Sequence, residues 1–292
     1  MQSIPFKQVD VFTNVRFKGN PVAVILKADG LATAQMQQIA NWTNLSETTF
    51  VLSATEPGAD YRVRIFTPNA ELPFAGHPTI GTAHALMEAG LVRAKDGVLV
   101  QQCIAGLIRL QVTKEADGAQ WISFDLPEPA LSPLTVGQVQ ELEGLLGVAL
   151  KNGVLPQLVD VGPRWLVAQL ENAQAVLAIQ PDLQRMKVQD VSHRYTGVVV
   201  FGQHEHREQS SIEVRAFAPA HGINEDPVCG SGNGCVAAFI RHSGQVASFG
   251  SAFLATQGAA VGRAGVVRLA VSDERIQVGG NAVTCIDGML SV

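Results

Sequence analysis

An internal repeat constrains the fold of this chain more than any other feature of its sequence. Residues 63–68 read Val-Arg-Ile-Phe-Thr-Pro and residues 214–219 read Val-Arg-Ala-Phe-Ala-Pro, so four of six positions are identical at an offset of 151. Pro-Phe-Ala-Gly-His at 73–77 then matches Pro-Val-Cys-Gly-Ser at 227–231 at an offset of 154. Both offsets are close to half of the 292 residues. We therefore predict a duplicated unit (strand, turn, glycine-containing loop, helix) with a three-residue insertion in the second copy.

Short apolar runs predict strands through most of both halves, whereas helices are few. Without a regular alternation of strand and helix, this pattern indicates an α+β protein. Proline at the start and glycine just past the end mark one helix near 78–90. The other helices are expected at 31–42, 136–146, 171–178 and 231–243.

The sequence pattern changes after Leu126-Pro127-Glu128-Pro129, and this change predicts a domain boundary. We expect one domain over residues 1–128, completed by the C-terminal strand 281–292, and a second domain over 129–280. A chain of this length accommodates about two domains of 100–200 residues.

Composition narrows the function classes. The net charge is −5 and the pI is near 5.8, and without a basic run we expect no nucleic-acid partner. No apolar run approaches the roughly 20 residues of a membrane span and no secretory leader is evident, so we expect a cytoplasmic protein without membrane association. Four scattered cysteines without a CxxC pair predict neither a disulfide framework nor a structural zinc site.

The duplicated helix starts have a chemical consequence. A helix N-terminus presents unpaired N–H groups and the positive end of the helix dipole, and both favour anions. If the two halves face each other, two such termini meet over one cleft. We expect such a cleft to hold a substrate carboxylate and to stabilise negative charge that develops during a reaction.

Two residues of the first half are candidates for acid/base chemistry. Glu47 precedes an expected strand at Thr48–Leu52. A carboxyl group at the edge of an apolar strand suits a general acid or base because desolvation favours its protonated form; the simpler interpretation is a solvated or capping residue. His77 stands at a helix start, where it either carries a proton and binds an anion or only packs in its loop.

Three residues of the second half deserve the same comparison. Asp226 either shapes the turn before Pro227 or binds a substrate group. Ser231 is the positional twin of His77. Cys229, in a glycine-rich helix start, would suit a proton carrier if its pKa were lowered, but a two-thiol racemase would need a second thiol at Ala75. The glycine run after Cys229 lacks the spacing and the Lys-Ser/Thr of nucleotide-binding loops, so we expect no nucleotide.

A series of short motifs in a fixed order carries a family resemblance. The motifs are Asp10-Val11-Phe12-Thr13, Gly19-Asn20-Pro21, Ser46-Glu47-Thr48, Phe66-Thr67-Pro68, Gly76-His77-Pro78-Thr79, Phe217-Ala218-Pro219, Glu225-Asp226-Pro227, Gly230-Ser231, Gln257-Gly258, Gly262-Arg263 and Val278-Gly279-Gly280-Asn281-Ala282-Val283. With them the chain resembles the PhzF family, the phenazine-biosynthesis isomerase and its relatives, over nearly its whole length.

The resemblance implies a diaminopimelate-epimerase-like fold. Such a fold has two pseudo-symmetric domains, each with a β-barrel-like sheet around a central helix, and an active site in the cleft between them. It also implies a homodimer that needs no metal or organic cofactor. The family's acid/base glutamate falls on Glu47. Its substrate-binding residues fall on His77, Asp226 and Ser231, in loops that include Gly76 and Gly230.

The implied activity is an isomerisation by proton shift on a small carboxylated, amino-bearing substrate such as 2,3-dihydro-3-hydroxyanthranilate. Cys229 departs from this pattern, because the phenazine isomerase has threonine there, and it resembles the racemase and epimerase branch of the same fold. Two alternatives therefore stay open. One is a one-thiol racemase or epimerase that uses Cys229 with Glu47 or His77 as the opposite base. The other is a small-molecule binding protein without catalysis.

Overall fold

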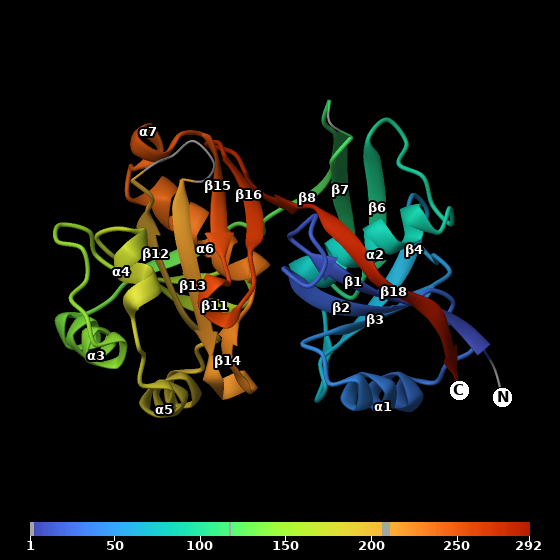
Figure 1. Ribbon diagram of the computed structural model, residues 1–292, viewed down its shortest axis with the longest axis horizontal. Helices are drawn as coiled ribbons and strands as arrows, with labels where there is room; N and C mark the ends of the chain where they lie inside the picture. Colours follow the sequence, from blue (N-terminus) through green and yellow to red (C-terminus); the bar gives the residue numbers. More distant parts are fainter. Residues whose placement is uncertain (1–2, 117, 206–210) are drawn as a thin grey trace. The chain divides into compact units, whose positions relative to one another are not determined.

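The computed structural model of the chain describes residues 3–116, 118–205 and 211–292 (Figure 1). The chain forms two compact units, which we call unit 1 (residues 1–125 and 279–292) and unit 2 (residues 126–278). The chain leaves unit 1 at Leu126 and returns to it at Gly279. The sequence predicts these boundaries after residues 128 and 280, which is three and two residues further along the chain.

Unit 1 is built on one sheet around a helix. Its strands pair in the order β18–β1–β2–β3–β4–β6–β7–β8, and the short β5 pairs with the end of β4. The pairs β2–β3 and β4–β6 are parallel, and α1 and α2 provide their crossovers. The elements are β1 (Ser3–Val11), β2 (Asn20–Ile25), α1 (Thr33–Thr43), β3 (Thr48–Leu52), β4 (Tyr61–Phe66), β5 (Glu71–Leu72), α2 (Gly76–Glu88), β6 (Val98–Cys103), β7 (Gly106–Lys114), β8 (Gln120–Asp125) and β18 (Ala282–Ser291).

Unit 2 repeats this topology. Its strands pair in the order β9–β10–β11–β12–β13–β15–β16, with β14 on the end of β13 and with β11–β12 and β13–β15 as the parallel pairs. The elements are β9 (Ala130–Pro133), α3 (Val136–Leu146), β10 (Gln157–Asp160), β11 (Arg164–Gln169), α4 (Ala173–Ala178), α5 (Leu183–His193), β12 (Gly197–Gln203), β13 (Ile212–Ala218), β14 (Ile223–Asp226), α6 (Gly230–His242), α7 (Val246–Phe249), β15 (Ala252–Gln257), β16 (Gly265–Val271) and β17 (Ile276–Gly280). The predicted duplication is therefore visible strand by strand.

One helix in each unit is surrounded by its sheet. Helix α2 contacts β1, β2, β3, β8 and β18, and α6 contacts β10, β11, β12 and β16. Glycines allow this close packing: a Cβ on Gly81 would stand 2.4 Å from a methyl carbon of Val22, and one on Gly234 would stand 2.6 Å from a methyl carbon of Leu126. The predicted α+β class, with two similar sheets each around a central helix, is confirmed.

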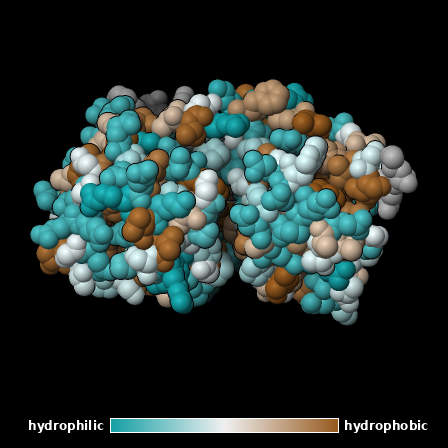
Figure 2. All heavy atoms as spheres, turned by 90° about the horizontal axis from the view of Figure 1, so that it is seen from below, coloured by the Kyte–Doolittle hydropathy of each residue, from teal (hydrophilic) through white to brown (hydrophobic). Residues whose placement is uncertain are grey.

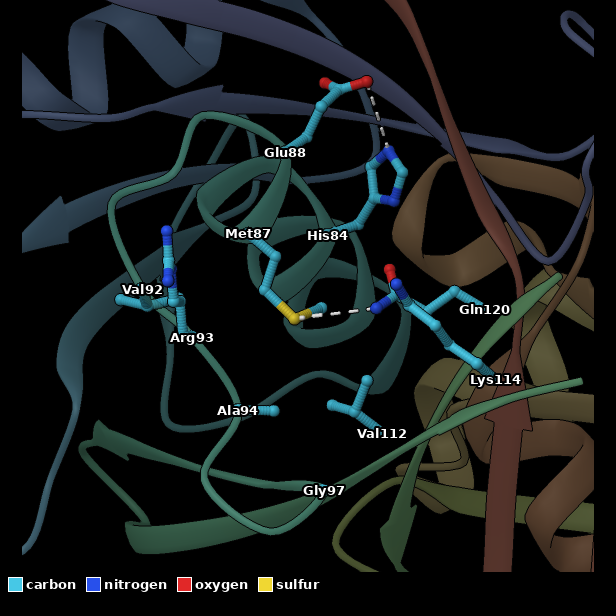
Figure 3. Close-up of a pocket in the computed structure, with 10 residues that line it drawn as sticks. All are labelled: His84, Met87, Glu88, Val92, Arg93, Ala94, Gly97, Val112, Lys114 and Gln120. Atoms are coloured by element: carbon cyan, nitrogen blue, oxygen red, sulfur yellow. Dashed lines mark hydrogen bonds and ion pairs between the residues drawn. The ribbon is translucent and has the colours of Figure 1, made fainter. Parts of the chain in front are cut away.

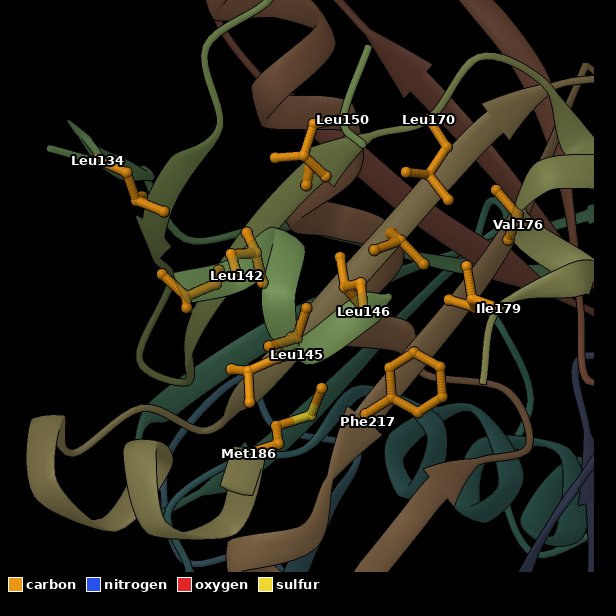
Figure 4. Packing of buried hydrophobic residues seen from close by; sticks show 14 of the residues in the cluster. Leu134, Leu142, Leu145, Leu146, Leu150, Leu170, Val176, Ile179, Met186 and Phe217 are labelled. Carbon is orange, nitrogen blue, oxygen red and sulfur yellow. The ribbon is translucent and has the colours of Figure 1, made fainter. Parts of the chain in front are cut away.

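A second apolar layer covers the other face of the sheet in unit 2 (Figure 4). Leucines of α3 (Leu142, Leu145 and Leu146) pack there with Met186 of α5 and Phe217 of β13. Helix α5 was not predicted from the sequence. Met186 is the only apolar side chain that its eleven residues bury, so the period-3.6 pattern that marks an amphipathic helix is missing.

The face of the molecule in Figure 2 is mostly hydrophilic, as expected for a chain that buries its apolar residues within each unit. On the face drawn in Figure 2, hydrophilic residues cover most of each unit and hydrophobic atoms occur in small groups. Within the described ranges, no helix is long and apolar enough to cross a membrane.

The repeat also preserves an ion pair. Arg64 of β4 donates from Nε and Nη2 to the two carboxylate oxygens of Glu71 at 2.7 and 2.6 Å. Arg215 of β13 binds Glu225 of β14 in the same two-pronged way at 2.9 and 2.8 Å. Its Nη1 also donates to the carbonyl groups of Val176 and Ile179. Each pair joins the strand before the glycine loop to its neighbour, and bidentate pairs of this kind are strong and directional.

Loss of the unit 2 pair should destabilise the protein strongly. Arg215→Leu leaves the Glu225 carboxylate, whose side chain is 10% exposed, without its counter-ion, so we expect the free energy of unfolding to fall by about 3–5 kcal/mol. Urea denaturation followed by tryptophan fluorescence measures this. Lys95→Gln is the control, because it removes an ion pair whose lysine is 83% exposed, and it should cost under about 1 kcal/mol. Equal losses in the two variants would contradict the argument.

Candidate active site

Glu47 and His77 are brought together in unit 1. Glu47 directly precedes β3, and His77 is the second residue of α2. Their side chains are 15% and 8% exposed, and His77 Nε2 lies 3.4 Å from Glu47 Oε2. Glu47 and His77 are 30 positions apart in the sequence. The β2–α1–β3 connection positions Glu47 and the β4–α2 connection positions His77, so the fold brings the two side chains together. A carboxyl group and an imidazole in contact are the usual parts of a proton-transfer site.

Burial sets the charge state of His77. It lowers the pKa of the imidazole to about 3, although the ring also hydrogen-bonds the carbonyl of Pro21. The ring is therefore neutral near pH 7 and carries one N–H. Nε2 makes no hydrogen bond within the described structure, which assigns the Pro21 bond and the N–H to Nδ1. Nε2 then presents a lone pair to Glu47 and can accept a hydrogen bond from the carboxyl group when it is protonated.

Buried hydrogen bonds fix the helix that carries His77. Thr82 of α2 donates to Thr49 Oγ1 of β3 at 2.9 Å, which ties the helix to the strand that follows Glu47. Gln101 of β6 donates to Thr79 Oγ1 at 2.9 Å and accepts from the Tyr61 hydroxyl at 3.1 Å. Satisfied buried networks of this kind hold one geometry, because any displacement would leave polar groups unpaired.

The start of α6 in unit 2 carries a thiol and a hydroxyl group, whereas the start of α2 carries an imidazole. The Sγ of Cys229 caps the helix by accepting from the N–H of Gly232 at 3.3 Å, and it lies 3.6 Å from Ser231 Oγ. Ser231 Oγ also accepts from the indole N–H of Trp165 at 3.1 Å. The start of α2 has no such cap, since its N-cap residue is Ala75. The hydroxyl of Ser231 is thus held in place from both sides.

A glutamine organises the loop before α6. Gln257 of β15 accepts from the N–H of Cys229 at 3.1 Å and from the amide of Asn233 at 2.8 Å, and it donates to the carbonyl of Asp226 at 2.9 Å. Asp226 Oδ1 in turn accepts from the N–H of Val228 at 3.0 Å. Burial raises the pKa of Asp226 to about 6. Asp226 therefore both shapes the turn, as the simpler interpretation held, and retains a carboxylate that ionises near neutral pH.

The electrostatics of Cys229 differ from the sequence expectation of a proton carrier. Burial, followed by the negative charge of Asp226, raises the pKa of the thiol well above its ordinary value. A helix N-terminus alone would lower the pKa of a thiol, but burial and the charge of Asp226 have the larger effect here. The side chain is a neutral thiol near pH 7 and acts as a helix cap.

The predicted residues therefore fall into two groups, one in each unit. Glu47, Gly76 and His77 lie together in unit 1, where a Cβ on Gly76 would stand 2.5 Å from the Phe124 ring. Asp226, Cys229, Gly230 and Ser231 lie together in unit 2. The supporting roles of Trp165 and Gln257 were not predicted, because their partners are 66 and 28 residues away in sequence.

Two similar sheets around central helices, each with a polar cluster at the helix start, define a diaminopimelate-epimerase-like protein. A family model described as phenazine biosynthesis-like protein (PhzC-PhzF) matches residues 9–288. The chain belongs to this family, as its motifs indicated.

Relatives of known name agree with this membership. The chain is 45% identical over 291 residues to antisense-enhancing sequence 1 of Schizosaccharomyces pombe, covering 97% of both chains. It is 34% identical over 282 residues to the trans-2,3-dihydro-3-hydroxyanthranilate isomerase of Pseudomonas fluorescens, covering 94% of this chain and 95% of that protein. The crystal structure of a PhzF-family protein of Bacillus anthracis superposes with a TM-score of 0.88 at 26% identity, with full coverage of both chains.

The neutral state of His77 can be tested directly. With a pKa near 3, its ring resonances should stay at neutral-imidazole positions between about pH 5 and pH 8, where an ordinary histidine titrates. Carbon-detected NMR of histidine-labelled protein measures this, and the His77→Asn variant identifies the signal. A titration midpoint near the ordinary value would contradict the assignment.

Asp226 predicts a pH dependence of stability. Its folded-state pKa of about 6 exceeds the ordinary value of 3.8, so the folded state binds the proton more tightly and this group's contribution to stability falls as pH rises from about 4 through 6. Asp226→Asn keeps an acceptor for the Val228 N–H but removes the ionisation. Relative to wild type, the variant should therefore gain about 1–3 kcal/mol between about pH 4.5 and pH 7.5. Urea denaturation at both values measures it, and an unchanged difference would contradict the prediction.

Proposed function

We propose that the chain is a cofactor-independent isomerase in which Glu47 moves a proton on a small carboxylated, amino-bearing substrate. The observation that carries the proposal is the contact of the Glu47 carboxyl group with the neutral, acceptor face of His77. Membership in a family whose relatives include proteins named isomerases supports the reaction class. A compound such as 2,3-dihydro-3-hydroxyanthranilate is our first candidate substrate, after the name of the Pseudomonas fluorescens relative.

The proposed chemistry is a balanced proton shift. The Glu47 carboxylate removes a proton from one carbon of the substrate, the electron pair moves through the conjugated system, and the Glu47 acid, whose proton exchanges with solvent, protonates another carbon. When the proton leaves the hydroxyl-bearing carbon, the product is an enol, which tautomerises to its ketone without a redox step or group transfer. Between the two transfers the proton resides on Glu47, where His77 Nε2 accepts a hydrogen bond from the acid and holds it in position.

The groups of unit 2 are proposed to bind the polar parts of the substrate. The main-chain N–H groups at Gly230 and Ser231 start a thirteen-residue helix and suit a carboxylate. Asp226 suits a substrate amine. On this proposal, loss of the Ser231 hydroxyl weakens substrate binding more than it slows the proton transfer.

The alternative based on Cys229 has less support. A thiol acts as a base only as the thiolate, and burial raises the pKa of this thiol well above its ordinary value. Its Sγ is also engaged as the cap of α6. A carboxylate that contacts a neutral imidazole is the better base of the two.

Exchange with solvent separates these functions. We would incubate the protein in D2O with 2,3-dihydro-3-hydroxyanthranilate and a panel of amino and hydroxy acids, and follow the carbon-bound protons by NMR. Wild-type protein should incorporate deuterium into one of these compounds. Glu47→Gln should lower the rate by about 10²–10⁴-fold, since that is the usual contribution of a general acid or base.

The control variants decide the interpretation. Glu274→Gln makes the same chemical change at an exposed turn and should leave the rate unchanged. Cys229→Ala should retain exchange if Glu47 is the base. Exchange that survives in Glu47→Gln but disappears in Cys229→Ala would support the one-thiol epimerase. Binding of a compound without exchange would support the non-catalytic alternative.

A further inference from the structure

A cavity of unit 1 lies at the far end of the helix that carries His77. It has a volume of about 570 Å³, within the range of small-molecule sites. Its walls are the last two turns of α2, the segment 92–97 that follows, and the adjoining ends of β7 and β8 (Figure 3). The lining residue of α2 nearest to His77 in sequence is His84, seven residues along the helix, or about 10 Å at 1.5 Å per residue. The cavity is therefore separate from the Glu47–His77 pair.

One side of this cavity is apolar and adaptable. Met87, Val92 and Val112 contribute aliphatic side chains, and Ala94 adds a methyl group. Gln120 stands beside them, and among the described residues its amide Nε2 donates to the Met87 thioether, at 3.8 Å. Sulfur is a weak acceptor, so this amide donor is available to a ligand that offers an oxygen.

The charges around the cavity are unequal. Among the described residues of its wall the carboxylate is Glu88, which accepts from Lys7 at 2.8 Å and from the Thr284 hydroxyl at 2.6 Å. Lys7 also donates to Asp287 at 2.6 Å, so it offsets only part of the negative charge of Glu88 from outside the cavity. His84 is neutral, because burial lowers its pKa below the ordinary value.

Two cations complete the lining. Arg93 and Lys114 stand on opposite sides of the cavity (Figure 3). Lys114 is opposite Gln120 in the β7–β8 register, so both side chains face the same way. Among the ion pairs formed by the described residues, none includes Arg93 or Lys114. The described lining thus presents two cations and one carboxylate next to an apolar wall.

We propose that this cavity is a second binding site, for a small amphipathic carboxylate. The aliphatic body of the ligand packs against Met87, Val92 and Val112. Its carboxylate is met by Lys114 and accepts a hydrogen bond from the neighbouring Gln120 amide, while Arg93 adds positive charge on the opposite side. The site is independent of the proton-shift chemistry proposed above, since it shares no residue with it.

Methyl NMR of the full-length protein tests this site with octanoate as the probe. The Met87 methyl signal, among five methionines, should shift and saturate as octanoate is added. 1-Octanol, which has the same chain without the charge, should bind at least about tenfold more weakly, because charge recognition contributes to the octanoate complex. The Met87→Leu variant identifies the signal.

Two paired variants separate the cavity from a general charge effect. Arg93→Gln with Lys114→Gln should weaken octanoate binding at least about tenfold. Arg185→Gln with Lys187→Gln changes the net charge equally on the exposed side of α5 in unit 2 and should leave binding unchanged. Ala94→Trp should fill the cavity and abolish the shift in a protein with unchanged circular dichroism. An unshifted Met87 signal, equal binding of octanol and octanoate, or equal effects of the two charge variants would overturn the proposal.

Discussion

The two bidentate Arg–Glu pairs are the interaction on which both halves of the molecule depend. In unit 1, Arg64 and Glu71 are separated by a short connection, and in unit 2 the corresponding connection between Arg215 and Glu225 is three residues longer. The pair forms in both places with nearly the same geometry. In both, the guanidinium also lies over a phenylalanine two residues ahead, 5.1 Å from the Phe66 ring centroid and 5.0 Å from that of Phe217. The three extra residues of unit 2 lie in the turn between Arg215 and Glu225. The glycine loop therefore begins at the equivalent position of the sheet in both units.

A common geometry with different side chains explains how one duplicated unit supports two tasks. At the first helix start the sequence is Ala75-Gly76-His77 and at the second it is Cys229-Gly230-Ser231. The histidine contacts a carboxyl group that comes from a parallel crossover in its own unit. The serine instead accepts from Trp165 and lies beside the capping thiol. The backbone that positions these residues is repeated, and the chemistry is not.

The sequence was sufficient where a local signal existed. Helices α3 and α6 have their caps and glycine stops in the sequence, and the two site loops stand out through the repeat. Helix α5 was missed because its buried positions include Gln189 and Asp190 rather than an apolar stripe. Strands β5 and β14 are only two and four residues long, too short for a periodic pattern. The contacts of Trp165 and Gln257 join residues far apart in the chain, so only the folded sheet shows that they support Ser231 and the loop of Asp226.

Burial sets the charge states of three ionisable groups near the two helix starts. It lowers the pKa of His77 to about 3, raises that of Asp226 to about 6 and raises that of Cys229 well above its ordinary value. Each shift favours the neutral form of its group, because removal from water penalises charge of either sign. A neutral imidazole and a neutral thiol cannot exchange a proton productively with each other near pH 7. A neutral imidazole beside a carboxyl group can instead accept a hydrogen bond from the acid when that group is protonated. On the proposed mechanism, the burial that keeps Cys229 protonated in unit 2 has its counterpart in unit 1, where burial leaves His77 Nε2 as an acceptor for the Glu47 carboxyl group.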